Sequence, residues 1–285
     1  MWEAVRRLSP FLPLLAGQAH GRPREDLQTV FADRLAPAAA AGFTAVTAWL
    51  GDAAGDRAET AEAIAAQGLV LTDMECIGNW LPGHAAATGG WADAVRGATP
   101  EAIMDLGAQL GARTVSVVEL LGIEWDPAAQ ARAFAAICDR AAEHGMAVVI
   151  EPVPVGAVST FARARELVER AGRDNAGIML DSWHFFRSGS SLDDLAHCPG
   201  HLIGSIQLND ALAAPEADLN AGMMRRLLPG AGEFDLKSFM QALAATGTGA
   251  PIGIEVFCPE LDALDTASAM ARCAAALDLC LEMTK

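Results

Sequence analysis

The chain has 285 residues, a formal net charge of −16 and an apolar fraction of 52%. This length fits one α/β barrel or two smaller domains, and because no linker-like stretch divides the chain we predict a single domain over residues 1–285. The negative charge and the lack of a basic cluster exclude nucleic acid as the expected partner, since a polyanion would be repelled. No uncharged apolar stretch reaches 18 residues, so we expect no membrane span.

The N-terminus, MWEAVRRLSPFLPLLAG, only weakly imitates a signal peptide, because two prolines break its short apolar run. We interpret residues 11–16 within it as the first strand. The six cysteines are scattered and form no CxxC pair. This pattern favours reduced thiols and a cytoplasmic protein.

Strand-like apolar runs alternate with helix-like, alanine-rich stretches along the whole chain. After the first strand, we predict strands over residues 43–49, 69–76, 114–119, 147–152, 176–181, 203–210 and 251–257. Helices are predicted over 126–145, beginning with Asp126 and Pro127, and over 160–172, ending near Gly172. Eight such units predict a (β/α)8 TIM barrel. An open doubly wound sheet is the alternative, although its usual Gly-rich phosphate loop is absent.

Four polar side chains stand at the carboxyl ends of the last four predicted strands: Glu151, Asp181, Gln207 and Glu255. The carboxyl ends of parallel barrel strands meet at one face, where active sites of barrels lie. A single carboxylate in such a place often only caps a helix or pairs with a base. Four in consecutive units predict oxygen ligands for one divalent cation, Mg²⁺ or Mn²⁺ first, with Co²⁺ or Zn²⁺ as alternatives.

Several stretches resemble the xylose-isomerase-like TIM barrel family from about residue 40 to the C-terminus. They are IEP at 150–152, LDSWHFFRSG at 180–189, IQLNDA at 206–211, LLPGAGEFDL at 227–236 and IEV at 254–256. The family includes sugar phosphate isomerases and epimerases, hydroxypyruvate isomerases, inosose and 3-dehydroshikimate dehydratases, and endonuclease IV. The resemblance implies the same four metal ligands. The endonucleases hold three zinc ions with extra histidines, whereas here only His184 falls in a family motif, so phosphodiester cleavage is not expected.

The resemblance also implies a reaction. In these enzymes a proton is removed next to the carbonyl of a small polyhydroxylated substrate, and the metal stabilises the resulting enediolate. Glu151 and Glu255 would be the acid/base carboxylates, and His184 a partner of a substrate hydroxyl or a further acid/base. A packed loop residue is the alternative for His184. Returning the proton to the other face gives epimerisation, returning it to the neighbouring carbon gives isomerisation, and loss of a β-hydroxyl gives dehydration.

Further residues are candidates for substrate binding. Arg226 and Arg187 carry the planar donor fork that suits carboxylate or phosphate, although each could instead be a solvated surface residue. Glu75 and Glu119 also end predicted strands and would line the pocket. Asp210 is expected to orient a ligand or to cap the next loop. Relatives often pair through loops at the barrel mouth, so a homo-oligomer is a further expectation.

Gln207 stands where many sugar epimerases of the family have histidine. Glutamine resembles the hydroxypyruvate isomerases, whose following Gly-Arg-His-Glu-Pro stretch is absent here, and the bacterial 3-dehydroshikimate dehydratases, which share the long gap to the last glutamate. The stretches at 180–189 and 227–236 resemble sugar phosphate isomerases and epimerases instead. We predict an isomerase or epimerase of a small ketose, with a 3-dehydroshikimate or inosose dehydratase type as the alternative and a catalytically silent sugar-binding barrel as the second alternative.

Overall fold

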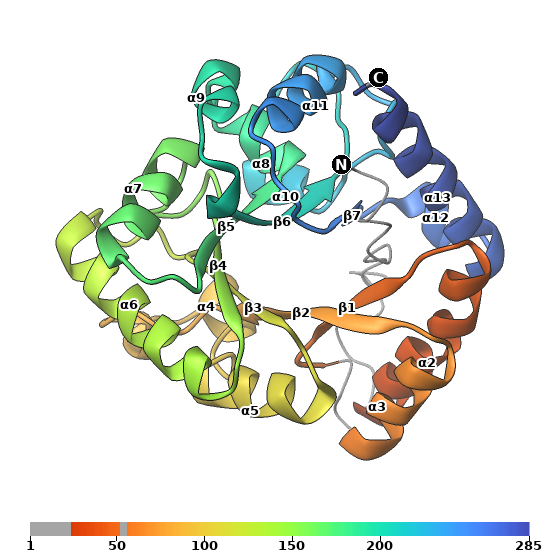
Figure 1. Cartoon of the computed structure of the whole chain (residues 1–285), viewed down its shortest axis with the longest axis horizontal. Helices are drawn as coiled ribbons and strands as arrows, with labels where there is room; N and C mark the ends of the chain where they lie inside the picture. Colours follow the sequence, from red (N-terminus) through yellow and green to blue (C-terminus); the bar gives the residue numbers. More distant parts are fainter. Residues whose placement is uncertain (1–23, 52–55, 285) are drawn as a thin grey trace.

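The computed structural model describes residues 24–51 and 56–284. In this part of the chain seven parallel strands form one curled sheet, with each strand beside its neighbour in sequence and helices around the outside (Figure 1). The strands are β1 (Ala45–Trp49), β2 (Val70–Ile77), β3 (Thr114–Val118), β4 (Ala147–Glu151), β5 (Ala176–Asp181), β6 (Ile203–Leu208) and β7 (Ile252–Ile254). This is the arrangement of a TIM barrel, so the predicted fold class is confirmed.

All seven of these strands coincide with predicted ones, to within three residues at either end. The strand expected within residues 11–16 lies outside the described residues. The helices are α2 (Arg24–Ala40), α3 (Arg57–Ala66), η2 (His84–Ala86), α4 (Trp91–Ala94), α5 (Pro100–Leu110), α6 (Pro127–Glu143), α7 (Phe161–Ala171), α8 (Ser182–Arg187), α9 (Leu192–Ala196), η3 (Gly200–Leu202), α10 (Leu219–Met223), α11 (Leu236–Ala245), α12 (Pro259–Asp262) and α13 (Thr266–Glu282).

The two helices predicted in most detail begin and end where local chemistry requires. Asp126 caps α6, because its side chain accepts the backbone N–H groups of Ala128 and Ala129. Helix α7 ends at Gly172, which has a φ of 59° in the left-handed region that favours glycine. Both predicted boundaries are therefore confirmed.

Helices cover the outer face of the sheet because alternate strand residues face outward. On β4, Val148 and Ile150 belong to the main apolar core, together with Phe134 of α6 and Leu167 of α7. Successive side chains of a strand point to opposite faces, so Glu151 belongs to the other, interior face of β4. Packing of the outer helices thus fixes the direction in which the strand-end acids point.

The segment after β5 is a helix and not the loop that was one interpretation for His184. Helix α8 begins there at Ser182, directly after the strand. The Asp181 carboxylate caps it by accepting the backbone N–H of His184 at 2.9 Å. One aspartate therefore ends the strand and starts the helix, which fixes its carboxylate at the carboxyl end of the barrel.

Asp210 organises the long segment after β6. Its carboxylate accepts the backbone N–H groups of Gly232 and Phe234, each at 3.0 Å. Its own backbone pairs with Leu227 in an antiparallel bridge. A side chain at Gly232 would have no room, because its Cβ would lie 2.4 Å from an Asp210 carboxylate oxygen. The loop-capping expectation for Asp210 is confirmed, and the long segment after β6 is thereby held against its own start.

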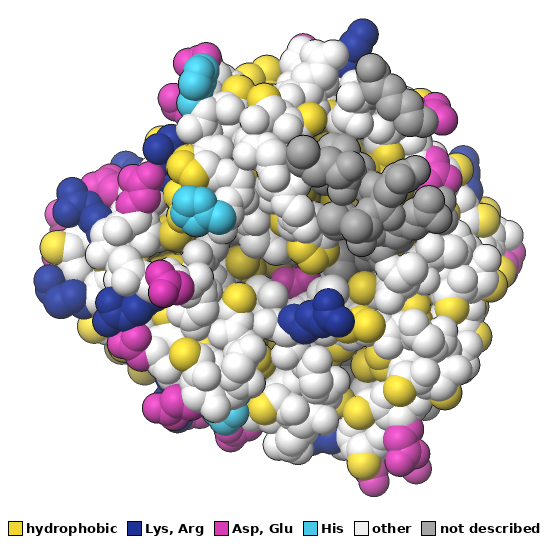
Figure 2. Space-filling model, in the orientation of Figure 1, with side chains coloured by type: hydrophobic (Ala, Val, Ile, Leu, Met, Phe, Trp, Pro, Cys, Tyr) yellow, Lys and Arg dark blue, Asp and Glu magenta, His cyan; other side chains and the backbone are white. Residues whose placement is uncertain are grey.

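On the face drawn in Figure 2, acidic side chains lie mostly around the periphery with Lys and Arg side chains among them, and acidic and basic atoms also lie beside the hollow near the centre. None of the helices in the described ranges is both long and apolar enough for a membrane crossing. All six cysteines are free thiols, and five of them are buried.

Candidate metal centre

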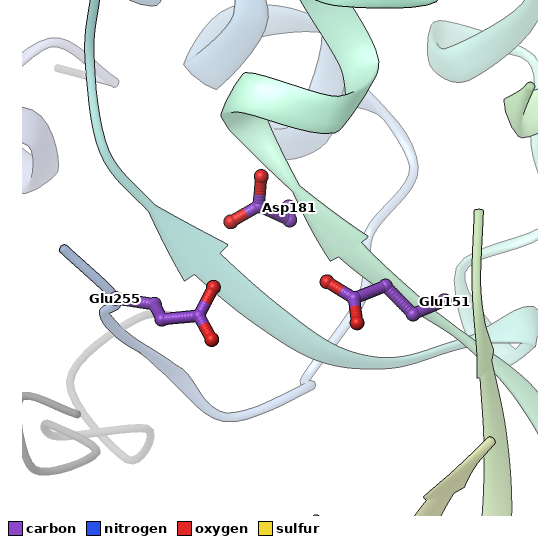
Figure 3. A group of neighbouring side chains, drawn as sticks. All are labelled: Glu151, Asp181 and Glu255. Atoms are coloured by element: carbon purple, nitrogen blue, oxygen red, sulfur yellow. The ribbon is translucent and has the colours of Figure 1, made fainter. Parts of the chain in front are cut away.

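Three carboxylates converge at the carboxyl end of the barrel (Figure 3). Glu151 is the last residue of β4, Asp181 is the last residue of β5, and Glu255 directly follows β7. One oxygen of each lies within 4.8 Å of the others. Gln207 lies beside them, because it is the register partner of Asp181 on β6. The structure thus brings three of the predicted ligands together and sets the fourth on the adjoining strand.

Burial makes it costly to ionise all three carboxyl groups. Asp181 is 1% exposed and Glu255 is 5% exposed. Burial raises the pKa of Glu255 to about 7, although Arg226 acts in the opposite direction. Burial, and after it the carboxylates of Glu255 and Asp181, hold the pKa of Glu151 well above its usual range. Burial also raises the pKa of Asp181. The cluster therefore needs positive charge or protons.

Arg226 supplies one positive charge. Its Nη1 donates to Asp181 Oδ2 at 3.0 Å and to Glu255 Oε2 at 2.6 Å. Its Nε donates to the carbonyl of Met223 at 3.0 Å, and its guanidinium lies 5.5 Å from the ring centroid of Trp183. The side chain is 2% exposed, so the alternative of a solvated surface residue is wrong for Arg226. Arg226 belongs to the long segment after β6, which places its side chain at the carboxyl ends of the strands.

The imidazole of His184 lies between Arg226 and Glu151. Its Nε2 lies 3.2 Å from Arg226 Nη2 and 3.3 Å from Glu151 Oε1. Burial, followed by the charge of Arg226, holds the pKa of His184 well below its usual 6.5, so the imidazole is neutral. Because arginine can only donate, Nε2 is the acceptor and the proton resides on Nδ1. The single lone pair of Nε2 faces Arg226, so Glu151 lies close to this nitrogen without a hydrogen bond of its own.

The amide of Gln207 is held from one side only. Its Nε2 donates to Glu75 Oε1 at 3.0 Å. The other oxygen of Glu75 accepts the indole N–H of Trp49 at 3.1 Å. Among the described residues, Oε1 of Gln207 is buried and has no hydrogen-bond partner. Burial, and then the carboxylates of Glu255 and Glu151, hold the pKa of Glu75 well above its usual range.

These donors fit a hard divalent cation. They are oxygen atoms throughout, three from carboxylates and one from an amide, which suits Mg²⁺ or Mn²⁺ better than a thiolate-preferring ion. A buried amide oxygen without a partner in the described ranges is an atom that such an ion would satisfy. A divalent charge would also offset the burial of three acids. The residues that would hold it are Glu151, Asp181, Gln207 and Glu255.

Glu119, a predicted substrate-binding residue, is tied to neighbouring loops. Its carboxylate accepts the backbone N–H groups of Leu121, at 2.8 Å, and of Ala157. It also lies 3.4 Å from Nε2 of the buried His84. Burial alone would raise its pKa, but the hydrogen bonds from His84 and the two backbone groups outweigh burial and lower the pKa of Glu119. This acid is therefore ionised and held by protein donors.

Arg187, the second predicted anion anchor, is engaged in the segment after β6. Its guanidinium donates to Glu216 through Nε at 3.0 Å and to the carbonyl of Leu212 through Nη2 at 2.8 Å. It also lies 4.9 Å from the ring centroid of Phe234. Only 4% of the side chain is exposed, so the solvated surface alternative is wrong for Arg187 as well.

Two residues that support the site were not singled out from the sequence. Asn209 donates through Nδ2 to Asp181 Oδ2 at 2.5 Å. Its position two residues after Gln207, on the same face by strand alternation, was the available signal. Trp49 contacts Glu75 because the two are register partners on β1 and β2. No local pattern indicates that contact, since it depends on the pairing of strands 26 residues apart.

Comparison with known proteins places the chain in a family. Residues 35–277 match the xylose isomerase-like TIM barrel model, so the chain belongs to that family and the resemblance found in its motifs is confirmed. Its structural neighbours include the IolI protein, solved with a bound zinc atom, with a TM-score of 0.74 and 20% identity over 91% of this chain and 96% of that one. A D-psicose 3-epimerase crystallised with D-fructose gives a TM-score of 0.67 and 18% identity over 89% and 93%. These likenesses show the fold.

Two relatives are more similar in sequence. An inosose isomerase from Bacillus licheniformis is 33% identical over 129 residues, which are 44% of this chain and 45% of the relative. A 3-dehydroshikimate dehydratase from Pseudomonas aeruginosa is 32% identical over 156 residues, which are 54% of this chain and 25% of the relative. Each match spans less than half of the relative's length. Distant relatives of the chain thus include both isomerases and dehydratases.

Proposed function

We propose that the protein is a divalent-metal-dependent isomerase or epimerase of a small ketose or a related hydroxy-carbonyl compound. One observation carries the proposal: three carboxylates with raised pKa values, of which Asp181 and Glu255 are buried, converge at the carboxyl end of the barrel, beside Gln207. When bound by these four side chains, the cation supplies positive charge next to the oxygen on which charge develops as a neighbouring carbon loses its proton.

The two glutamates carry the proton in this proposal. Burial raises the pKa of Glu255 to about 7, near the pH at which a general base works best. Glu151 and Glu255 extend toward each other from opposite sides of the cluster in Figure 3. One carboxylate removes the carbon-bound proton, and the other delivers a proton to the opposite face for epimerisation. Delivery to the adjacent carbon gives isomerisation instead.

His184 and Arg226 orient the substrate. The neutral imidazole of His184 presents an Nδ1–H that is buried and unpartnered within the described residues, so it can donate to a substrate hydroxyl. Arg226 holds Asp181, Glu255 and His184 in place, and one remaining N–H of its Nη2 could donate to a substrate oxygen. For Arg187, Glu119 and Glu75, whose polar groups hold other parts of the protein, we propose a supporting position around the substrate. The six free thiols support a cytoplasmic location.

A dehydratase is the second candidate. The similarity to the Pseudomonas aeruginosa 3-dehydroshikimate dehydratase covers more of this chain than the similarity to the inosose isomerase, 54% against 44%. The same carboxylate could remove the proton while an adjacent hydroxyl leaves as water. A sugar-binding barrel without activity is less well supported, because binding alone does not require carboxylates whose pKa values are raised toward neutrality.

A substrate panel separates these functions. The protein loaded with Mn²⁺ is incubated in D₂O with ketoses, inososes and 3-dehydroshikimate, and products are followed by NMR and mass spectrometry. An isomerase or epimerase alters the stereochemistry or the carbonyl position, and it changes the mass of the substrate only by the deuterium taken up at the reacting carbon. A dehydratase lowers the mass by one water. Binding without any product would contradict both and favour the silent barrel.

A further inference from the structure

Gln207 differs from the other proposed ligands because an amide has one atom that can bind a cation and one that cannot. Its carbonyl oxygen has lone pairs, whereas its NH₂ group only donates hydrogen bonds. A rotation of 180° about the last side-chain bond exchanges the two with little change in shape. The orientation of this amide therefore decides whether β6 supplies a ligand at all.

The protein fixes that orientation through a chain of two hydrogen bonds. Gln207 Nε2 donates to one oxygen of Glu75, and Trp49 Nε1 donates to the other, at 3.0 and 3.1 Å. Glu75 is 3% exposed, so water does not replace these partners. With a cation bound at the centre, the added positive charge favours the carboxylate form of Glu75, which accepts at both oxygens, whereas an indole N–H can only donate. Glu75 therefore faces Gln207 with an acceptor and selects the amide rotamer whose nitrogen points to it.

We propose that Glu75, oriented by Trp49, is a positioning residue that turns the carbonyl oxygen of Gln207 toward the metal centre. This inference rests on the metal site of the proposed function. It adds a residue that holds one of the four proposed ligands in place. It assigns Glu75 a role through Gln207, where the sequence alone suggested contact with substrate. Outer hydrogen-bond partners of this kind commonly change metal affinity about tenfold to a hundredfold when removed.

Glu75→Gln tests the orientation by reversing it. The indole N–H of Trp49 requires an acceptor, so the new side chain turns its carbonyl oxygen to Trp49 and its NH₂ to Gln207. Gln207 must then turn its own oxygen toward that NH₂ and its nitrogen toward the centre. Trp49→Phe in the same chain removes the orienting donor, so the new glutamine can turn its oxygen back to Gln207. Trp49→Phe alone leaves a carboxylate that accepts on both sides.

Asp73→Asn is the matched control. Asp73 lies on the same strand, two residues before Glu75, and is 1% exposed. Its carboxylate contacts Ser205 Oγ at 3.5 Å and has no contact with Gln207 among the described hydrogen bonds. The substitution removes a buried acid from β2 without touching the amide. It therefore measures how much of any effect comes from the loss of charge.

The experiment measures the Kd for Mn²⁺ alone by calorimetry, with folding checked by circular dichroism. We expect Glu75→Gln to weaken binding about tenfold to a hundredfold. The double variant Trp49→Phe/Glu75→Gln should regain most of that loss. The single variants Trp49→Phe and Asp73→Asn should bind Mn²⁺ with a Kd near that of wild type. An unchanged Kd for Glu75→Gln, a double variant as weak as the single one, or an equal loss in Asp73→Asn would overturn the inference. A wild-type protein that does not bind Mn²⁺ would overturn the metal centre itself and this inference with it.

A wild-type measurement covers the case in which Glu75→Gln does not fold. The side-chain amide protons of Gln207, identified by their loss in Gln207→Glu, should exchange slowly with D₂O because Glu75 holds them in a buried site. The slow exchange of these amide protons should be retained when Mg²⁺ is added. Rapid exchange in the folded wild-type protein would show that Glu75 does not hold the amide.

Discussion

Acidic side chains end strands on two sides of the barrel, and their surroundings differ. On the β4–β7 side, Glu151, Asp181 and Glu255 face one another, and Arg226 donates to Asp181 and Glu255. On the β2–β3 side, Glu75 and Glu119 are each held by several protein donors. The same residue types at or near strand ends thus form an acidic cluster in one half of the barrel and are tied to protein donors in the other.

The difference is visible in the sign of the pKa shifts. Glu119 has a lowered pKa, because hydrogen bonds from His84 and two backbone groups outweigh the effect of burial. Glu255 has a pKa raised to about 7, because burial outweighs the effect of Arg226. A carboxylate that is saturated with donors is a poor base, whereas one that is buried beside other acids takes up and releases protons near neutrality. Glu75 stands between these cases, since its pKa is raised although both its oxygens are engaged.

Glu255→Gln should produce the largest effect. Removing a general base typically costs about 10²–10⁴-fold in turnover, and the amide oxygen can still accept from Arg226, so the fold should persist. The measurement is kcat on the substrate that the panel identifies, with circular dichroism as the control. Turnover within a few-fold of wild type would remove Glu255 from the chemistry.

Asp181→Asn should weaken Mn²⁺ binding by more than about a hundredfold, because a directly bound carboxylate contributes more than an outer partner. Calorimetric titration measures this change. Glu119→Gln serves as the matched variant on the β2–β3 side and should leave the Kd near the wild-type value. Equal losses in the two variants would erase the distinction between the two halves.

Glu119→Gln should instead lower stability. Its NH₂ group would face a backbone N–H that now donates to the carboxylate, and an unsatisfied buried donor costs about 1–3 kcal/mol. Gly156 passes so close to Glu119 that a Cβ there would lie 1.8 Å from the Glu119 carbonyl oxygen, which leaves little room for relaxation. Urea unfolding measures the change. A variant as stable as wild type would show that the donors around Glu119 do not support the fold.

A smaller effect should appear in the pH dependence of stability without metal. The pKa of Glu255 rises from 4.5 to about 7 on folding, so its contribution is fully present below about pH 4.5 and is lost as pH rises through 7. In EDTA, Tm should therefore fall by a few degrees over this interval, and Glu255→Gln should reduce the fall. Mn²⁺ should raise Tm more at pH 8 than at pH 5. A Tm that rises with pH in EDTA would contradict the shift.

Sequence reasoning located the strands and the acids at their ends because each depends on a local pattern. The run VVIE, for example, specifies both a buried strand and the acid that ends it. The burial of Arg226 could not be predicted, since it depends on the folding of a long segment around Asp210. The contact of Trp49 with Glu75 depends on register between strands, which a single sequence does not reveal. The single domain over residues 1–285 stays a prediction, because residues 1–23 lie outside the described part.

A crystal grown with Mn²⁺ tests most directly whether the β4–β7 side holds one divalent cation. Anomalous scattering should give one strong peak at the carboxyl end of the barrel. It should lie about 2.0–2.6 Å from an oxygen each of Glu151, Asp181, Gln207 and Glu255. No peak there at saturating Mn²⁺, or a peak bound to the Glu75 and Glu119 carboxylates instead, would contradict the account.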